Sequence, residues 1–206
     1  MIAASLYFAI TLLNVLMRKL VVSMNVTLNG YMAGPFGELD WHTPYWDNEL
    51  SRALTQQLGN ADTLLLGRVT YSAIAPYWQA QQANQFGARE DADYADMINR
   101  YEKVVFSKTL KKVSWRNSRL ATRNVSKEIM RLKQCAGKDL LVYGSGKLVS
   151  ALTNLSLVDE YRIWVYPVAL TRGRPLFKGL KEKLGVRPYQ VKVFDTGVVL
   201  MCYETK

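Results

Sequence analysis

The stretch that decides the fold is LLVYGSGKLVSAL, residues 140–152. Its first four residues have strand character, Gly144-Ser145-Gly146 follows, and the residues after Lys147 have helical spacing. The pattern predicts a buried strand, a tight turn and a helix. In open α/β sheets ligands lie at such turns, where free backbone N–H groups begin a helix. The glycines therefore either serve the turn alone or leave the backbone open to a ligand.

Other segments place this unit within a larger alternation of strands and helices. ADTLLLGRVTYSAI (61–74) repeats the order strand, turn and helix, and KVVFSKTL (103–110) repeats a strand followed by a polar turn. The first strand is predicted over Lys19–Val26. Helices are predicted over residues 47–58, over 94–101, and from Ser126 to near Gly137. We expect residues 79–93 to form a surface excursion.

The C-terminal part of the chain has a different character. DEYRIWVYPVAL (159–170) is too β-branched and aromatic for a helix, and residues 189–204 indicate two strands about Asp195-Thr196-Gly197. We therefore predict an α/β fold of three layers, with helices on both faces of a mixed, mostly parallel sheet that ends in an antiparallel hairpin. The 206 residues, 49% of them hydrophobic, are enough for one domain with a full core.

The charge is unevenly distributed along the chain. The net charge is +10, and residues 101–206 hold 21 Lys and Arg against 8 Asp and Glu. Such asymmetry indicates an anionic partner, either nucleic acid or a phosphorylated small molecule, or else a solvated basic face. The cations are dispersed and no nucleic-acid-binding motif is present, so we expect no nucleic-acid partner.

Residues 1–16 form an apolar run that we expect to be an extension outside a domain of residues 17–206. The run is shorter than the roughly 20 residues of a membrane helix, and its basic pair, Arg18-Lys19, follows it, which is the wrong order for a secretory signal. We therefore expect no membrane partner. Cys135 and Cys202 lie far apart without histidines at ligand spacing, so we expect neither a disulfide framework nor a metal site. Two separated cysteines without a disulfide framework fit a protein of the reducing cytoplasm.

Three predicted strand ends carry a small residue followed by a cation. Gly67 precedes Arg68, Ser107 precedes Lys108, and Gly146 precedes Lys147. Three such ends together fit a large polyanion such as a dinucleotide. No Gly-x-Gly-x-x-Gly follows the first strand, so the common dinucleotide fingerprint is absent.

These segments also carry a resemblance to a known family. LLLGRVTYSAI (64–74), VVFSKTL (104–110) and the run from LLVYGSGKLVSAL to GRPLF (140–177) are similar to blocks of the dihydrofolate reductase superfamily. The most similar branch is the reductase domain of bacterial riboflavin biosynthesis, and the similarity extends over residues 17–204. The resemblance implies a cytoplasmic, often homodimeric reductase. It would transfer hydride from NADPH to a small planar heterocycle of the pyrimidine or pteridine type.

The resemblance also implies the roles of the three turns. Arg68 would reach the 2′-phosphate of NADPH, with Ser107 and Lys108 completing that pocket. The remaining cofactor residues would be Gly67 and Thr70 in the first turn and Gly144, Ser145, Gly146 and Lys147 at the pyrophosphate. The residue types in these turns agree with NADPH as the cofactor, because a 2′-phosphate needs Arg or Lys and no Asp or Glu is placed to bind a bare ribose hydroxyl.

The proton donor and the substrate contacts are less well defined. Asp40 and Asp47 are the two candidates for the catalytic carboxylate, although Asp40 also fits a loop residue and Asp47 an N-cap. Trp41, Tyr45 and Trp46 can stack on a planar ring or belong to the core. Two other functions stay open: a nucleotide-binding protein of this fold without turnover, and a basic nucleic-acid-binding module.

Overall fold

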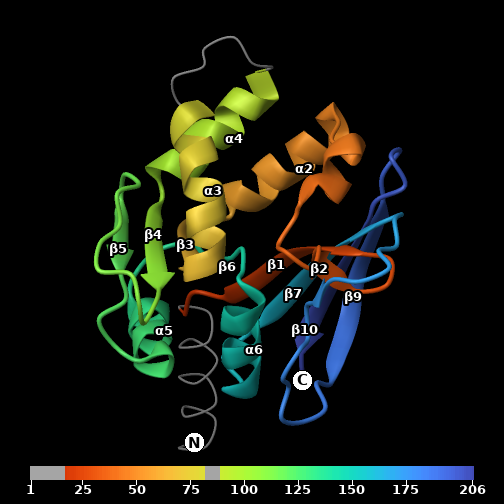
Figure 1. The fold of residues 1–206 in the computed structure, drawn as a ribbon. Helices are drawn as coiled ribbons and strands as arrows, with labels where there is room; N and C mark the ends of the chain where they lie inside the picture. The colour runs from red at the N-terminus through yellow and green to blue at the C-terminus, as the bar shows by residue number, and fades with distance from the viewer. Residues whose placement is uncertain (1–16, 82–88) are drawn as a thin grey trace, which may run out of the picture.

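The computed structural model describes residues 17–81 and 89–206, and its main feature is an eight-stranded sheet in the order β5-β4-β3-β6-β1-β7-β10-β9 (Figure 1). The strands are β1 (Leu20–Thr27), β3 (Ala61–Gly67), β4 (Glu102–Phe106), β5 (Ser118–Leu120), β6 (Asp139–Val142), β7 (Glu160–Tyr166), β9 (Val186–Val193) and β10 (Val199–Thr205). The helices are α2 (Asn48–Gly59), α3 (Arg68–Gln81), α4 (Arg89–Arg100), α5 (Val125–Gln134) and α6 (Gly146–Asn154). A second, small sheet pairs β2 (Tyr31–Ala33) with β8 (Arg174–Pro175).

The strand directions confirm the predicted mixed sheet. β1 lies near the centre and pairs in parallel with β6 and with β7. β3, β4 and β5 continue the parallel part, while β10 runs antiparallel to both β7 and β9. The terminal hairpin turns where the sequence predicts it, because Val199 pairs with Val193 across Asp195–Gly197.

Two apolar clusters, one on each face of the sheet, form the core and confirm the three layers. On β3, Leu64 and Leu66 point to one cluster and Leu65 to the other, as the alternation of side chains in a strand requires. The first cluster contains side chains of α2, α3 and α4, and the second contains side chains of α5 and α6. Both faces of β3 are covered, which explains its continuous run of apolar residues.

Helix boundaries differ from the prediction in two places. α5 begins after Asn124, whose side chain accepts a hydrogen bond from Lys127 N at 2.9 Å, and ends at Gln134 rather than near Gly137. The expected surface excursion over residues 79–93 is also partly wrong, since residues 79–81 belong to α3 and 89–93 to α4. Residues 82–88 lie outside the described residues, as does the expected apolar extension over residues 1–16.

The C-terminal end of α4 is bound by a buried lysine. Lys103 Nζ donates hydrogen bonds to the carbonyls of Ile98 (2.9 Å), Asn99 (2.9 Å) and Tyr101 (2.7 Å). The amine also lies 4.7 Å from the centroid of the Trp115 ring. Burial, with a smaller contribution from the nearby charge of Arg116, lowers the pKa of Lys103 to about 8. Lys103 thus satisfies helix carbonyls that would otherwise have no donor.

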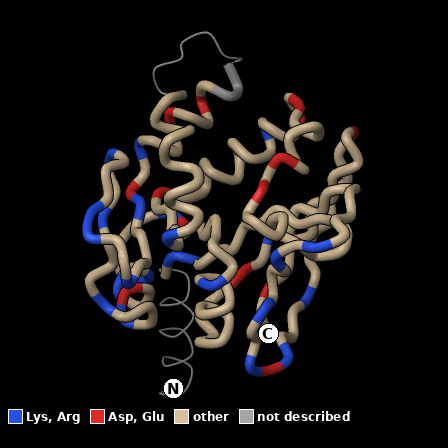
Figure 2. The backbone as a smooth tube through the Cα atoms, in the orientation of Figure 1, with Lys and Arg blue, Asp and Glu red and all other residues tan. Residues whose placement is uncertain are grey.

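Many basic residues of the second half of the sequence lie at the β4, β5 and α5 edge of the molecule, and others lie along the C-terminal loops and strands, as the blue segments of Figure 2 show. Several of them form ion pairs there, and Arg119 and Arg131 both bind the buried carboxylate of Glu128. Within residues 17–81 and 89–206, none of the helices combines the length and apolar character needed to cross a membrane. Both cysteines are free thiols, with Cys135 exposed and Cys202 buried.

Candidate functional site

The structure brings the three predicted turns together at the carboxyl edge of the parallel strands. Gly67 at the end of β3 is paired in register with Phe106 at the end of β4, so Arg68 and Ser107 follow neighbouring strand ends. On the other side of β3, Gly67 N donates a hydrogen bond of 2.7 Å to the carbonyl oxygen of Gly144. The turns after β3, β4 and β6 therefore form one continuous edge.

The glycines of these turns are explained by close packing between protein atoms. A Cβ at Gly67 would lie 2.9 Å from Ser145 N, and Gly144, at φ +108°, would place a Cβ 2.8 Å from Thr70 Oγ1. A Cβ at Gly146 would lie 2.5 Å from Met32 Cε. The turns could not approach each other this closely with larger residues. The Cα atoms of these glycines therefore face protein rather than open space.

The backbone N–H groups at the start of α6 are in a different situation. Ser145 is the N-cap residue, but its side chain makes no capping hydrogen bond. The first N–H groups of a helix have no partner within the helix, and they carry partial positive charge. Lys147, in the first turn, is exposed. This start of α6 fits an anionic group such as a phosphate.

The turns after β3 and β4 contain the two basic residues that are predicted to bind the 2′-phosphate. The side chains of Arg68 and Lys108 are exposed. The Oγ of Ser107 accepts hydrogen bonds from Thr109 N (3.1 Å) and Leu110 N (2.9 Å), so this oxygen shapes the turn itself.

The loop that follows this turn is anchored to α3. The Tyr71 hydroxyl accepts hydrogen bonds from Ser114 N at 2.9 Å and Trp115 N at 3.0 Å. Tyr71 lies on α3 three residues after Arg68, which is one turn of the helix. The loop that carries Lys108 is thus held next to the helix that carries Arg68.

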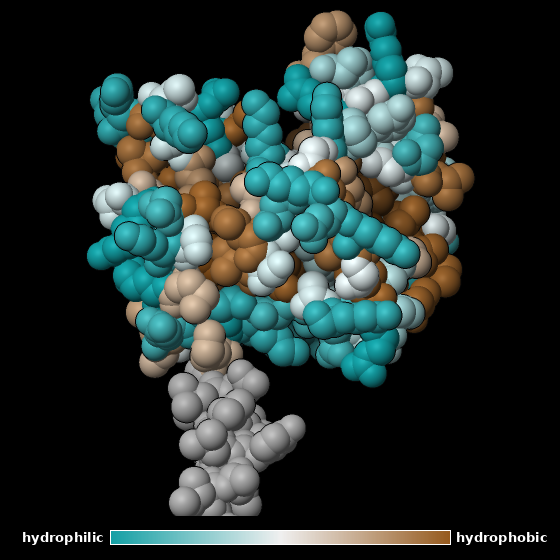
Figure 3. All heavy atoms as spheres, turned by 90° about the horizontal axis from the view of Figure 1, so that it is seen from below, coloured by the Kyte–Doolittle hydropathy of each residue, from teal (hydrophilic) through white to brown (hydrophobic). Residues whose placement is uncertain are grey.

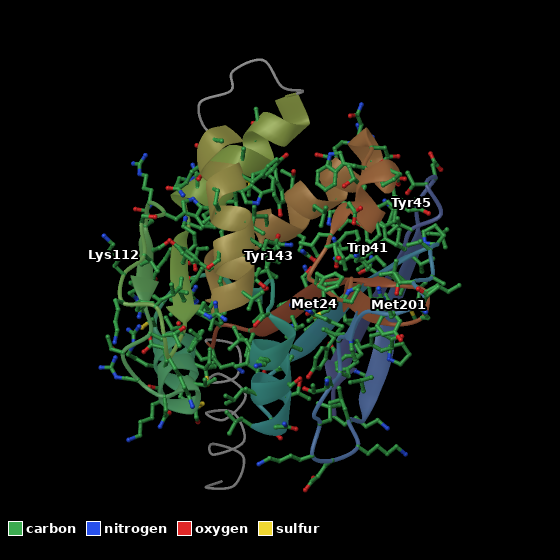
Figure 4. The ribbon with its side chains drawn as sticks, in the orientation of Figure 1. Met24, Trp41, Tyr45, Lys112, Tyr143 and Met201 are labelled. Atoms are coloured by element: carbon green, nitrogen blue, oxygen red, sulfur yellow. The ribbon has the colours of Figure 1, made fainter. Side chains whose placement is uncertain are left out.

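A group of aromatic side chains lies on the side of the site away from these cations. Trp41, His42 and Tyr45 belong to the 3₁₀ helix η1 (Asp40–Tyr45), and their rings surround Tyr166 at centroid distances of 5.3, 5.9 and 5.8 Å. Tyr166 ends β7 and pairs with Thr27 at the end of β1, so it also lies at the carboxyl edge. Figure 4 shows Trp41 and Tyr45 together in this region. We call these four residues the aromatic group.

Two polar atoms of the aromatic group are buried without a hydrogen-bond partner. They are Trp41 Nε1 and the Tyr166 hydroxyl oxygen, and the two residues are 8% and 0% exposed. Burial raises the pKa of Tyr166, so its hydroxyl is protonated at neutral pH. Burial also lowers the pKa of His42, although Asp40 opposes that shift, so His42 is neutral as well.

Tyr143 and its partners form a polar network under α2 and α4. Tyr143 directly follows β6, and the Tyr94 hydroxyl donates a hydrogen bond of 3.1 Å to its oxygen. Burial raises the pKa of Tyr143 to about 12, against the lowering effect of hydrogen bonds from Tyr94 and Gln57. Gln57 is also hydrogen-bonded to Ser23 on β1. Neither Tyr143 nor Tyr166 was predicted as a site residue, although both lie in segments of predicted strand character.

The two candidate carboxylates have different environments. Asp47 is the N-cap of α2, and its Oδ1 accepts a hydrogen bond of 2.8 Å from Leu50 N, which is the capping role that the sequence left open. Asp40 is exposed at the first residue of η1. Trp46, which directly follows η1, is 39% exposed. The catalytic roles of Asp40 and Asp47 and the substrate contact of Trp46 stay predictions.

Among the residues that the structure describes, no group of three or more His, Cys, Asp or Glu side chains is arranged to hold a metal ion. The uncapped start of α6 and the cations of the first two turns fit the phosphates of a dinucleotide.

The strand order, the helices on both faces and the C-terminal hairpin define an α/β protein of the dihydrofolate-reductase-like type. The fold is similar to that of dihydrofolate reductase from Enterococcus faecalis in complex with NADP(H), with a TM-score of 0.56 and 14% identity over 91% of this chain and 96% of that one. The chain belongs to the RibD C-terminal domain family, whose family model matches residues 18–200.

The chain is also similar in sequence to one uncharacterized protein and in fold to a further solved structure. The uncharacterized protein YyaP of Bacillus subtilis is 30% identical over 195 residues, which are 93% of this chain and 97% of the relative. The diaminohydroxyphosphoribosylaminopyrimidine deaminase/5-amino-6-(5-phosphoribosylamino)uracil reductase of Thermotoga maritima has a TM-score of 0.66 and 15% identity. That match covers 92% of this chain and 57% of the longer protein. At these identities the likeness between structures shows the fold alone.

Proposed function

We propose that the protein is a reductase that transfers hydride from NADPH to a carbon of a small planar heterocycle. The observation that carries the proposal is the meeting of three strand-end turns at one sheet edge, with Arg68, Lys108 and the uncapped start of α6 along it. Membership of the RibD C-terminal domain family and similarity to solved reductase structures support it.

The cofactor-binding roles follow from the charges at this edge. The N–H groups at the start of α6 and Lys147 bind the pyrophosphate, and Arg68 and Lys108 bind the 2′-phosphate. No Asp or Glu occurs in the turns 67–70, 107–108 and 144–147, where a carboxylate would repel that phosphate. NADPH, when bound, supplies the hydride.

The substrate side is proposed to bind an uncharged ring. Trp41 and Tyr45 offer aromatic surface around Tyr166, and His42 among them is neutral. The names of the Thermotoga maritima and Enterococcus faecalis proteins give a uracil derivative and dihydrofolate as their substrates. A pyrimidine or pteridine ring is therefore the proposed substrate class. The proton that accompanies the hydride comes from Asp40 or from solvent, because Asp47 is engaged at the N-cap.

Cofactor titration and cofactor oxidation test this function separately. We expect NADPH to quench the tryptophan fluorescence at lower concentration than NADH. We also expect NADPH absorbance at 340 nm to fall when an oxidised pteridine or a 5-aminouracil derivative is added. Tight NADPH binding without oxidation across the panel would support the alternative of a nucleotide-binding protein without turnover. Equal affinity for the two cofactors contradicts the assigned 2′-phosphate pocket.

A second copy of this chain is the proposed protein partner. Val191 and Val193 on the edge strand β9 are 60% and 67% exposed, and they pair with Met201 and Val199 on the same sheet face. Figure 3 shows apolar side chains at the surface on the side where Figure 1 has β9. An exposed apolar edge of this kind favours association. Light scattering of the wild type and of Val193→Lys tests it: a monomeric wild type contradicts the proposal.

A further inference from the structure

Two polar atoms of the aromatic group have no hydrogen-bond partner, and they lie on residues that touch each other. Trp41 Nε1 and the Tyr166 hydroxyl are buried without partners, and their rings meet edge to face at 5.3 Å and 88°. A buried donor without a partner is unfavourable, and native structures keep few of them. Such a pair at the carboxyl edge of the sheet therefore requires an explanation.

We propose that Trp41 and Tyr166 form the hydrogen-bonding subsite for the substrate ring, in which Trp41 Nε1–H and the Tyr166 hydroxyl both donate to a ring carbonyl oxygen. This proposal rests on the proposed function, because it assigns the polar contacts of that same substrate. It adds a requirement for the ligand: the ring has to present a carbonyl oxygen to this end of the site.

The chemistry of the two donors defines the ligand atom. An indole N–H can only donate, so the ligand atom beside Trp41 has to be an acceptor. A carbonyl oxygen has two lone pairs and can accept from both residues. The hydroxyl of Tyr166 keeps its proton, because burial raises its pKa, and His42 beside it is neutral. The subsite therefore fits a neutral carbonyl group rather than a phosphate or an ammonium group.

Neighbouring buried aromatic side chains have partners for their polar atoms. Tyr94 donates to Tyr143 on the same face of the sheet, and Trp164 Nε1 donates to Ser23 Oγ at 3.0 Å. Among the described residues, the other buried side-chain atoms without a hydrogen-bond partner belong to Glu128 and Arg131, which form an ion pair with each other, and to the hydroxyls of Thr55, Ser118 and Thr196. Within the described part of the chain, Trp41 and Tyr166 are thus two touching aromatic residues that both keep an unused polar atom.

The approach of the ligand requires a movement of η1. Both atoms are closed to water in the present arrangement. The segment that covers them is short, and no side chain caps the start of η1. The Tyr45 hydroxyl attaches its end to β7 through one hydrogen bond of 3.3 Å to the Pro167 carbonyl. When η1 shifts, the carbonyl edge of the substrate ring would lie beside Trp41 and Tyr166.

The first experiment measures stability without any ligand. Tyr166→Phe removes a hydroxyl that has no partner, so we expect the Tm of the ligand-free protein to rise by about 2–6 °C. Tyr94→Phe is the matched control, because it removes a hydroxyl that donates to Tyr143, and its Tm should fall. A lower Tm for Tyr166→Phe would mean that its hydroxyl has a partner in the folded protein, and this would overturn the proposal.

The second experiment measures ring binding by fluorescence titration. The probes are 2-amino-4-oxopteridine and 2,4-diaminopteridine, which differ in one carbonyl acceptor. We expect the wild type to bind the oxo compound more tightly, and Tyr166→Phe to lose about tenfold for that compound alone. Equal losses for both probes, unchanged affinities, or no binding of the oxo compound by the wild type would each contradict the subsite. NADPH oxidation is recorded separately, so a protein that binds the ring without turnover contradicts the reductase function and not the subsite.

Discussion

The proposed cofactor side and the proposed substrate side of the site are built in different ways. On the cofactor side, Gly67, Ser107 and Gly144 lie at or just after the ends of three neighbouring strands, and backbone contacts hold their turns together. On the substrate side, Trp41 and Tyr166 are 125 positions apart and meet only through side-chain packing. The first side is specified by local sequence and strand order. The second depends on how a long loop folds over the sheet.

The largest expected effect is on the substrate side. Trp41→Ala removes a buried indole that packs on Tyr166, and truncation of a buried Trp typically costs about 3–5 kcal/mol. We expect the free energy of unfolding, measured in urea, to fall by that amount and pteridine binding to be lost. NADPH affinity should stay within about twofold, because no cofactor turn contains Trp41. A parallel loss of NADPH affinity would show that the two sides are not independent.

The next effect is on the cofactor side. Arg68→Glu replaces a cation at the proposed 2′-phosphate pocket by an anion, and hydrogen bonds to charged groups contribute about 1.5–3 kcal/mol. We expect NADPH affinity to fall by at least about tenfold while NADH affinity changes little. Lys127→Glu, at an exposed position of α5, is the control for a general change in charge. Equal losses for both cofactors would contradict the assignment of Arg68 to the 2′-phosphate.

A pair of glycine substitutions separates packing from ligand access within the turns. At Gly67 a Cβ meets the backbone of Ser145, which cannot move aside, so Gly67→Ala should destabilise the protein by about 1–3 kcal/mol. At Gly146 the close contacts of a Cβ are with the end of the Met32 side chain, which can change rotamer, while the Leu176 carbonyl oxygen lies at an ordinary 3.7 Å. Gly146→Ala should therefore lower the free energy of unfolding in urea by less than Gly67→Ala does. The reverse order would contradict the packing explanation of these glycines.

The same difference decides which parts of the fold and the site could be predicted from the sequence. The sheet, its hairpin and the meeting of the turns after Gly67 and Gly144 follow from the alternation of strands and helices, since parallel strands place their carboxyl ends at one edge. The capping of α2 by Asp47 could only be stated as an alternative, because an Asp before a helix fits a cap and a catalytic acid equally. The partners of Tyr143 come from α2 and α4, and no periodicity in the sequence indicates such a contact.

The smallest expected effect concerns the support of the loop that carries Lys108. Trp115 in that loop packs on the amine of Lys103, whose pKa burial lowers to about 8 from 10.5. Between pH 8 and 10.5 the unfolded chain holds a proton at Lys103 that the folded protein has released. The contribution of Lys103 to the free energy of unfolding therefore rises with pH across this window and is lowest below pH 8. Because the three carbonyl acceptors offset part of the desolvation of the charged amine, we expect a rise on the order of 1 kcal/mol. Urea unfolding of the wild type and Lys103→Met at pH 7, 9 and 10 measures it as the difference between the two proteins. A difference that stays constant over this range would show that the buried amine keeps its proton, and that its three carbonyl partners compensate for its desolvation.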